Sequence, residues 1–94
     1  MLFRSDTVEI REPVIVFEVL SEESAKRDHG DKVEAYFAVP SVQHYLIVDP
    51  ERYAIVHHRR GTDDNLLTRI RRSGTLRLDP PGIEIELAGV FERA

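Results

Sequence analysis

An apolar stretch near the start of the chain is the feature that most limits what this protein can fold into. Pro13 opens the run Val14–Leu20, in which every residue except Glu18 is apolar and most are β-branched or aromatic. This composition predicts a β-strand. Near-continuous hydrophobicity is typical of a strand covered on both faces, as in the centre of an α/β sheet.

The residues that follow predict a crossover to a second strand. Val33, Tyr36 and Phe37 have helical spacing, and Pro40 ends that helix. Another apolar strand is predicted at 44–49. A helix between two consecutive strands implies that the strands pair in parallel.

The rest of the chain alternates apolar and polar residues between turns. We expect antiparallel hairpins there, with strands at 53–58, 66–72, 75–78 and 83–87 and a short helical turn at 89–93. Residues 1–12 are weakly patterned, with five charged side chains among the twelve, and predict an irregular or extended segment. The 94 residues allow one domain, so the predicted fold class is a mixed α/β or α+β domain.

The composition excludes several classes of protein. The chain has no cysteine, which rules out disulfides, thiolate zinc sites and thiol nucleophiles. It has no apolar run long enough to span a membrane and no signal-peptide core, so we expect a cytoplasmic protein without a membrane partner. The formal net charge of −4 is not the strongly basic balance typical of nucleic-acid-binding proteins.

Glu18 is the first candidate for chemistry, because it interrupts the most hydrophobic strand. Burying a carboxylate without a partner costs several kcal/mol. One interpretation is a strand end that faces solvent. The other is a metal ligand or general base at the carboxyl end of a sheet strand, where the sites of such sheets lie.

Asp28, Lys32 and Tyr36 are the second set of candidates. They are spaced i, i+4 and i+8, so they line one face if the helix is continuous through Gly30. An ordinary ion pair with one tyrosine at the edge of the core explains the same pattern.

Taken together, these two features carry a resemblance. The segment Pro13–Ser21, then Asp28, Lys32 and Tyr36, then Val39–Pro50 with its strand ending in Val-Asp-Pro resembles the Uma2 family of proposed endonucleases. The similarity is weaker from Gly82 to Phe91. The resemblance implies a restriction-endonuclease-like fold of the PD-(D/E)XK superfamily, with one crossover helix and a mixed sheet.

The resemblance also implies a divalent-metal-dependent DNA endonuclease that uses Mg²⁺ or Mn²⁺. Glu18 would be a metal ligand and Lys32 the catalytic lysine, with Asp28, Tyr36 and Ser21 as supporting members of the motif. The superfamily's usual lysine lies two residues after the acidic residue. That position is Leu20 here, so the lysine on the following helix would take over its role.

One part of the family pattern is missing before Glu18. No Pro-Asp motif, which supplies the family's other metal-binding aspartate, precedes it, and Asp6 is a poor substitute. The resemblance therefore covers only the C-terminal portion of the family's fold. With one strand carboxylate, we expect Mg²⁺ or Mn²⁺ to bind weakly.

Two alternatives to an active nuclease remain open. The chain could be a truncated, inactive relative that serves as a dimerising or binding module, because the loss of neighbouring strands would leave the 13–20 strand with an edge open to a second copy. It could also be an unrelated α+β interaction domain. As an active relative, its partner would be DNA.

Histidines and arginines complete the set of candidates. His57 and His58 lie on opposite faces of a strand, while His29 and His44 lack metal-ligand spacing, so we expect all four at the surface. A basic stripe is predicted on the later strands, either as a solvated face or as a phosphate-contacting one; its members are Arg59, Arg60, Arg69, Arg71 and Arg77.

Overall fold

A computed structural model describes residues 12–21, 30–63 and 65–93. The strands are β1 (Ile15–Val19), β2 (His44–Asp49), β3 (Ala54–Arg60), β4 (Leu66–Arg71), β5 (Thr75–Leu78) and β6 (Ile83–Glu86), and the helices are α1 (Gly30–Phe37) and α2 (Leu87–Arg93). The mixed α+β class predicted from the sequence is confirmed.

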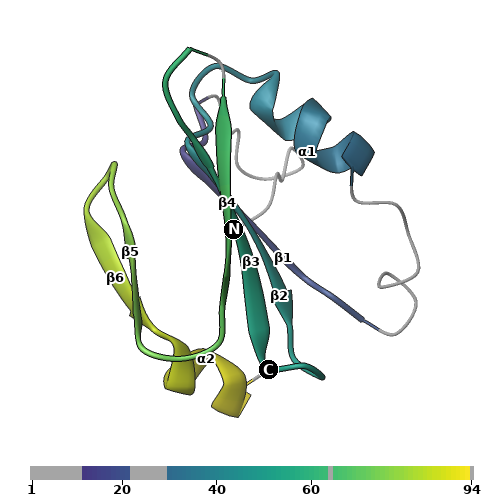
Figure 1. The fold of residues 1–94 in the computed structure, drawn as a ribbon, viewed down its shortest axis with the longest axis vertical. Helices are drawn as coiled ribbons and strands as arrows, with labels where there is room; N and C mark the ends of the chain where they lie inside the picture. The colour runs from purple at the N-terminus through teal and green to yellow at the C-terminus, as the bar shows by residue number, and fades with distance from the viewer. Residues whose placement is uncertain (1–11, 22–29, 64, 94) are drawn as a thin grey trace, which may run out of the picture.

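Four strands form the main sheet in the order β1-β2-β3-β4. β1 and β2 pair in parallel, as the helix between them requires, and β2-β3 and β3-β4 are antiparallel. β5 and β6 form a separate two-stranded sheet. Figure 1 shows this hairpin on one side of the main sheet and α1 on the other.

Each face of the main sheet therefore has its own core. On the α1 side, Val16, Tyr45 and Ile47 pack with Val42 and with half-buried side chains of α1. On the other side, the core combines the main sheet with the β5–β6 hairpin and α2; its buried members are Leu46, Val48, Ile55, Leu76, Leu78 and Leu87. Both faces of β2 are buried, which explains the continuous hydrophobicity of its sequence.

The turn before β3 moves the start of that strand by one residue. Tyr53, predicted as the first strand residue, has a φ of 50°, in the left-handed region that non-glycine residues adopt mainly in turns. The carboxylate of Asp49 accepts a hydrogen bond from the backbone N–H of Arg52 at 3.3 Å within the same turn. The register of β2 against β3 follows from this turn.

Candidate functional site

Glu18 lies near the carboxyl end of β1 and belongs to the face that α1 covers. Its Cα pairs with that of Ile47 on β2, and it follows Val16 by two residues, so both side chains point to the same core. The Glu18 side chain is 13% exposed. A solvent-facing strand end, one of the two interpretations from sequence, does not describe this position.

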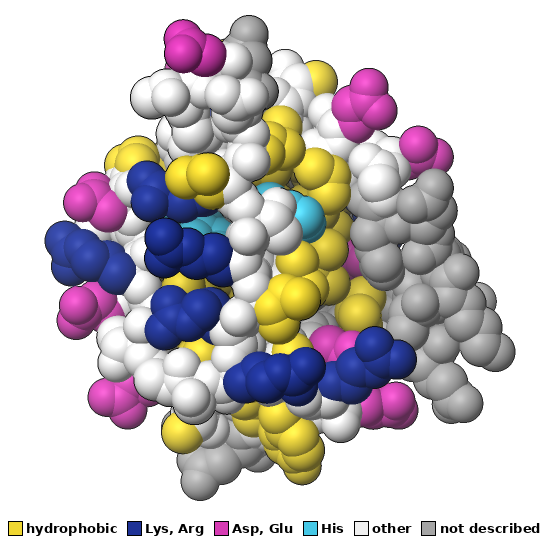
Figure 2. Space-filling view, in the orientation of Figure 1, with side chains coloured by type: hydrophobic (Ala, Val, Ile, Leu, Met, Phe, Trp, Pro, Cys, Tyr) yellow, Lys and Arg dark blue, Asp and Glu magenta, His cyan; other side chains and the backbone are white. Residues whose placement is uncertain are grey.

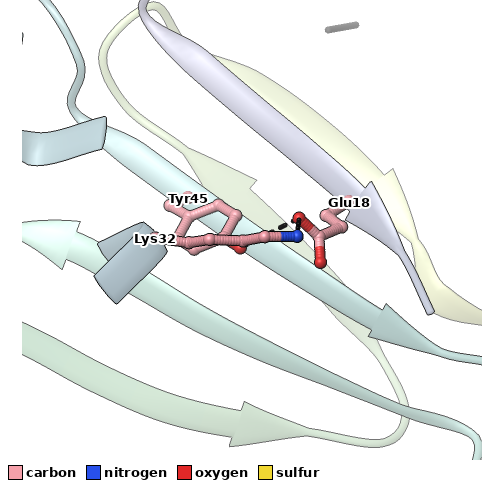
Figure 3. Close-up of polar contacts among 3 residues, drawn as sticks. All are labelled: Glu18, Lys32 and Tyr45. Atoms are coloured by element: carbon pink, nitrogen blue, oxygen red, sulfur yellow. Dashed lines mark hydrogen bonds and ion pairs between the residues drawn. The ribbon is translucent and has the colours of Figure 1, made fainter. Parts of the chain in front are cut away.

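Lys32 reaches Glu18 from the first turns of α1. Its Nζ lies 2.9 Å from Oε1 of Glu18, where it donates a hydrogen bond and forms an ion pair. Figure 3 shows the lysine and Tyr45 converging on the same carboxylate. The parallel β1–α1–β2 unit creates this meeting point, because it places the first turns of α1 beside the end of β1.

Tyr45 is a member of the site that sequence reasoning missed. Its hydroxyl donates to Oε1 of Glu18 at 3.3 Å. Burial, followed by the negative charge of Glu18, raises the pKa of this phenol above its usual range, so the hydroxyl remains a proton donor at neutral pH. The signal was available: parallel pairing sets Tyr45 opposite Val16, and hence on the face of Glu18.

Of the other predicted members of the motif, Tyr36 lies at the margin of this cluster. The ring of Tyr36 packs on that of Tyr45, with centroids 4.8 Å apart. Ser21 is exposed and lies three residues after Glu18. Asp28 and Asp6 lie outside the described residues. The structure therefore brings together Glu18, Lys32 and, through Tyr45, Tyr36.

The cluster fits a divalent ion only as a partial ligand set. Within 12–21, 30–63 and 65–93, no group of three or more acidic or histidine side chains could hold a metal. Mg²⁺ is commonly held by one or two carboxylates together with water and substrate phosphate. Glu18 could serve as one such carboxylate, and Lys32 is the cation beside it.

A comparison with models of protein families identifies the family of this chain. The family model of Uma2, described as "Putative restriction endonuclease", matches residues 4–89. The chain belongs to the Uma2 family. The match extends well beyond the Pro13–Pro50 segment that carried most of the resemblance, and the α+β architecture is consistent with a restriction-endonuclease-like fold. A search of curated proteins found no significant match.

Two histidines of this Uma2 chain were wrongly predicted to lie at the surface. His44 and His57 are buried, at 2% and 4% exposure, and not at the surface. Nδ1 of His44 lies 2.9 Å from Nε2 of His57, and Nε2 of His44 lies 2.7 Å from the carbonyl oxygen of Pro80. Burial lowers the pKa of both rings, that of His57 to about 4. His29 lies outside the described residues.

The predicted basic stripe of the Uma2 chain is divided between the two faces of the sheet. Arg60 points toward α1, where it donates hydrogen bonds to the carbonyl oxygens of Val42, Phe37 and Val39 at 2.9, 3.0 and 3.2 Å. Its inclusion in the stripe was wrong, because Arg59 and Arg60 are neighbours on one strand and face opposite ways. The remaining four arginines line a cavity on the other face.

Neither α1 nor α2, the helices in the described residues, is long and apolar enough to cross a membrane.

Proposed function

We propose that this chain is a Mg²⁺- or Mn²⁺-dependent DNA endonuclease that hydrolyses phosphodiester bonds at the Glu18–Lys32 cluster. The observation that carries the proposal is the 2.9 Å contact between Lys32 Nζ and Glu18 Oε1 in a chain of the Uma2 family. The pair joins the two functional groups that such a reaction requires, a carboxylate for the ion and a fixed cation for the phosphate.

Each residue has a distinct task in this proposal. A divalent ion, when bound, supplies an activated water and neutralises phosphate charge. Glu18 is a ligand for that ion. Lys32 stabilises the negative charge that develops on the phosphate oxygens in the transition state. Tyr45 is a positioning residue, because its hydroxyl holds the Glu18 carboxylate.

Nicking of supercoiled plasmid with Mg²⁺ or Mn²⁺ tests the proposal. We expect Glu18→Gln and Lys32→Met to lower the nicking rate by roughly 10²–10³-fold, the scale for loss of one charge-stabilising group. Glu34→Gln is the matched control, because Glu34 is exposed on α1; its rate should equal that of the wild type. Circular dichroism confirms that each variant is folded.

Equal nicking by the wild type and both variants would refute the assigned residues. The absence of nicking from every form would refute the nuclease proposal and favour the alternative, a non-cleaving dimerising or binding module. One observation supports that alternative. On the outer strand β4, Leu67 is 49% and Ile70 is 62% exposed, and within the described residues β4 pairs only with β3. Sedimentation of the same samples would detect the dimer.

A further inference from the structure

An open cavity of about 400 Å³ is lined by side chains of β3, β4 and β5. It lies on the side of the main sheet opposite α1, where Figure 1 shows the β5–β6 hairpin. Four arginines line it: Arg59 from β3, Arg69 and Arg71 from β4, and Arg77 from β5. Figure 2 shows Lys and Arg side chains stacked in a column on this face, beside a histidine.

The strand register produces this arrangement. Arg69 pairs with His57 and Arg71 pairs with Ile55 across the β3–β4 ladder. Residues directly opposite each other in a ladder, and residues two apart along a strand, share a face. Arg69 and Arg71 therefore line up along β4 on the face to which His57 contributes. The turn between β4 and β5 folds Arg77 back over the same cavity.

The charge of the cavity is only partly balanced. Arg77 lies 3.9 Å from Asp79 and 3.6 Å from Glu84. Arg59, Arg69 and Arg71 form no ion pair within 4.0 Å in the part of the chain that the structure describes. The pKa of His57 is lowered to about 4, first by burial and then by the neighbouring His44, and the positive charge of Arg59 lowers it further. Among the described residues, these three clustered cations thus stand without carboxylate partners, in a protein of net charge −4.

The chemistry of these side chains specifies the ligand. The guanidinium group is a planar fork that binds phosphate oxygens in a bidentate manner. Two arginines aligned on one strand, with a third beside them on β3, suit successive phosphates of one backbone better than a single ion. We propose that this arginine cavity binds the phosphate backbone of a nucleic acid, independently of base sequence.

The main sheet separates this cavity from the Glu18–Lys32 pair, since Glu18 belongs to the α1 face and the cavity to the other. The strand held in the cavity is therefore not the segment at the proposed cleavage centre. The choice of nucleic acid as the ligand rests on the proposed nuclease function. Binding itself requires neither cleavage nor a divalent ion.

Fluorescence anisotropy of a labelled 30-bp DNA duplex, measured in EDTA over a series of KCl concentrations, tests the inference. Each arginine–phosphate contact contributes about 0.9 to the slope of log Kobs against log[salt]. We expect Arg69→Gln/Arg71→Gln to weaken binding about tenfold or more and to flatten the slope by about 2. Arg69→Gln alone should flatten it by about 1; it leaves intact the hydrogen bond from Arg71 to the carbonyl oxygen of Thr75.

Arg52→Gln/Arg72→Gln is the matched control, because it removes the same charge from side chains that line a cavity on the α1 face. An equal loss of affinity in the two pairs would overturn the inference, since binding would then not depend on the arginine cavity in particular. If inorganic phosphate stabilises the folded protein but the duplex does not bind, the inference is also overturned, in favour of a small-anion site.

The nuclease proposal and this inference fail separately. Arginine-dependent binding by a chain that nicks no plasmid would leave the inference standing. Nicking by a chain whose salt slope is unchanged in Arg69→Gln/Arg71→Gln would refute the inference and leave the nuclease proposal intact.

Discussion

The Glu18–Lys32 ion pair should be energetically coupled, and a double-mutant cycle measures how strongly. The variants are Glu18→Gln, Lys32→Met and their combination. Gln at 18 retains an acceptor oxygen for the Tyr45 hydroxyl, so the cycle isolates the charge pair. Lys32→Met should cost more than Glu18→Gln. The former removes the cation beside a carboxylate that is only 13% exposed, whereas Lys32 is 33% exposed and can turn to solvent.

The magnitude follows from the distance and the burial. At 2.9 Å and an effective dielectric constant of ~20, the gross attraction is about 6 kcal/mol. Desolvation of two partly buried ions offsets most of it. Fully exposed pairs retain between about 0 and 1 kcal/mol. We therefore expect a coupling free energy of about 1 to 2 kcal/mol, with about 2 kcal/mol lost in Lys32→Met alone.

Urea denaturation followed by circular dichroism supplies the four free energies of unfolding. The control cycle uses Arg77→Met and Glu84→Gln. This pair is 3.6 Å apart with side chains 58% and 61% exposed, so its coupling should not exceed about 0.5 kcal/mol. If the Glu18–Lys32 coupling is no larger than that of the control, the burial argument is refuted and the contact carries no more energy than a surface pair.

Two further predictions concern stability. Burial lowers the pKa of His57 to about 4, so the unfolded chain binds a proton at this residue more readily than the folded chain. The free energy of unfolding should therefore fall by about 3 kcal/mol as the pH falls from about 6.5 to about 4. His57→Gln should therefore show a flatter profile of urea midpoint against pH, and an equally steep one would contradict the assignment. Arg60→Met should cost about 2 to 3 kcal/mol, because it removes three hydrogen bonds to backbone carbonyls at the end of α1 and in the segment that follows it. Arg52→Met is the control, because the Arg52 side chain is exposed, and its free energy of unfolding should stay within about 0.5 kcal/mol of the wild type. An equal loss of stability in both variants would contradict this role for Arg60.

Local patterns were sufficient to predict the strands and the parallel pair. The alternation on β3 placed His57 and His58 on opposite faces correctly, because the side-chain period of a strand does not depend on what packs against it. The meeting of Glu18 with Lys32 was expected from the family motif and not from spacing, since Gly30 left the continuity of the helix open. The roles of both residues stay predictions.

The histidine pair could not be deduced from spacing within a single strand. His44 and His57 belong to neighbouring strands, and they meet because the β2–β3 register sets Leu46 opposite His57. Counting outward from the Asp49–Pro50 turn would have placed both rings on one face. Their burial also depends on the β5–β6 hairpin, whose position no local pattern specifies. Arg60 was predicted on the wrong face for a simpler reason: adjacent residues of a strand point to opposite faces, so Arg59 and Arg60 do not share one stripe.

The hydrogen bonds of the histidine pair fix the direction of its protons. A carbonyl oxygen only accepts, so Nε2 of His44 carries a proton toward Pro80. In the neutral ring, Nδ1 of His44 then accepts from Nε2–H of His57, which leaves Nδ1 of His57 as the one unprotonated nitrogen that donates or accepts nothing within the pair. A proton added there breaks neither bond. The link between β2 and the hairpin is therefore kept when His57 is protonated, and the stability lost in acid is the cost of burying that charge.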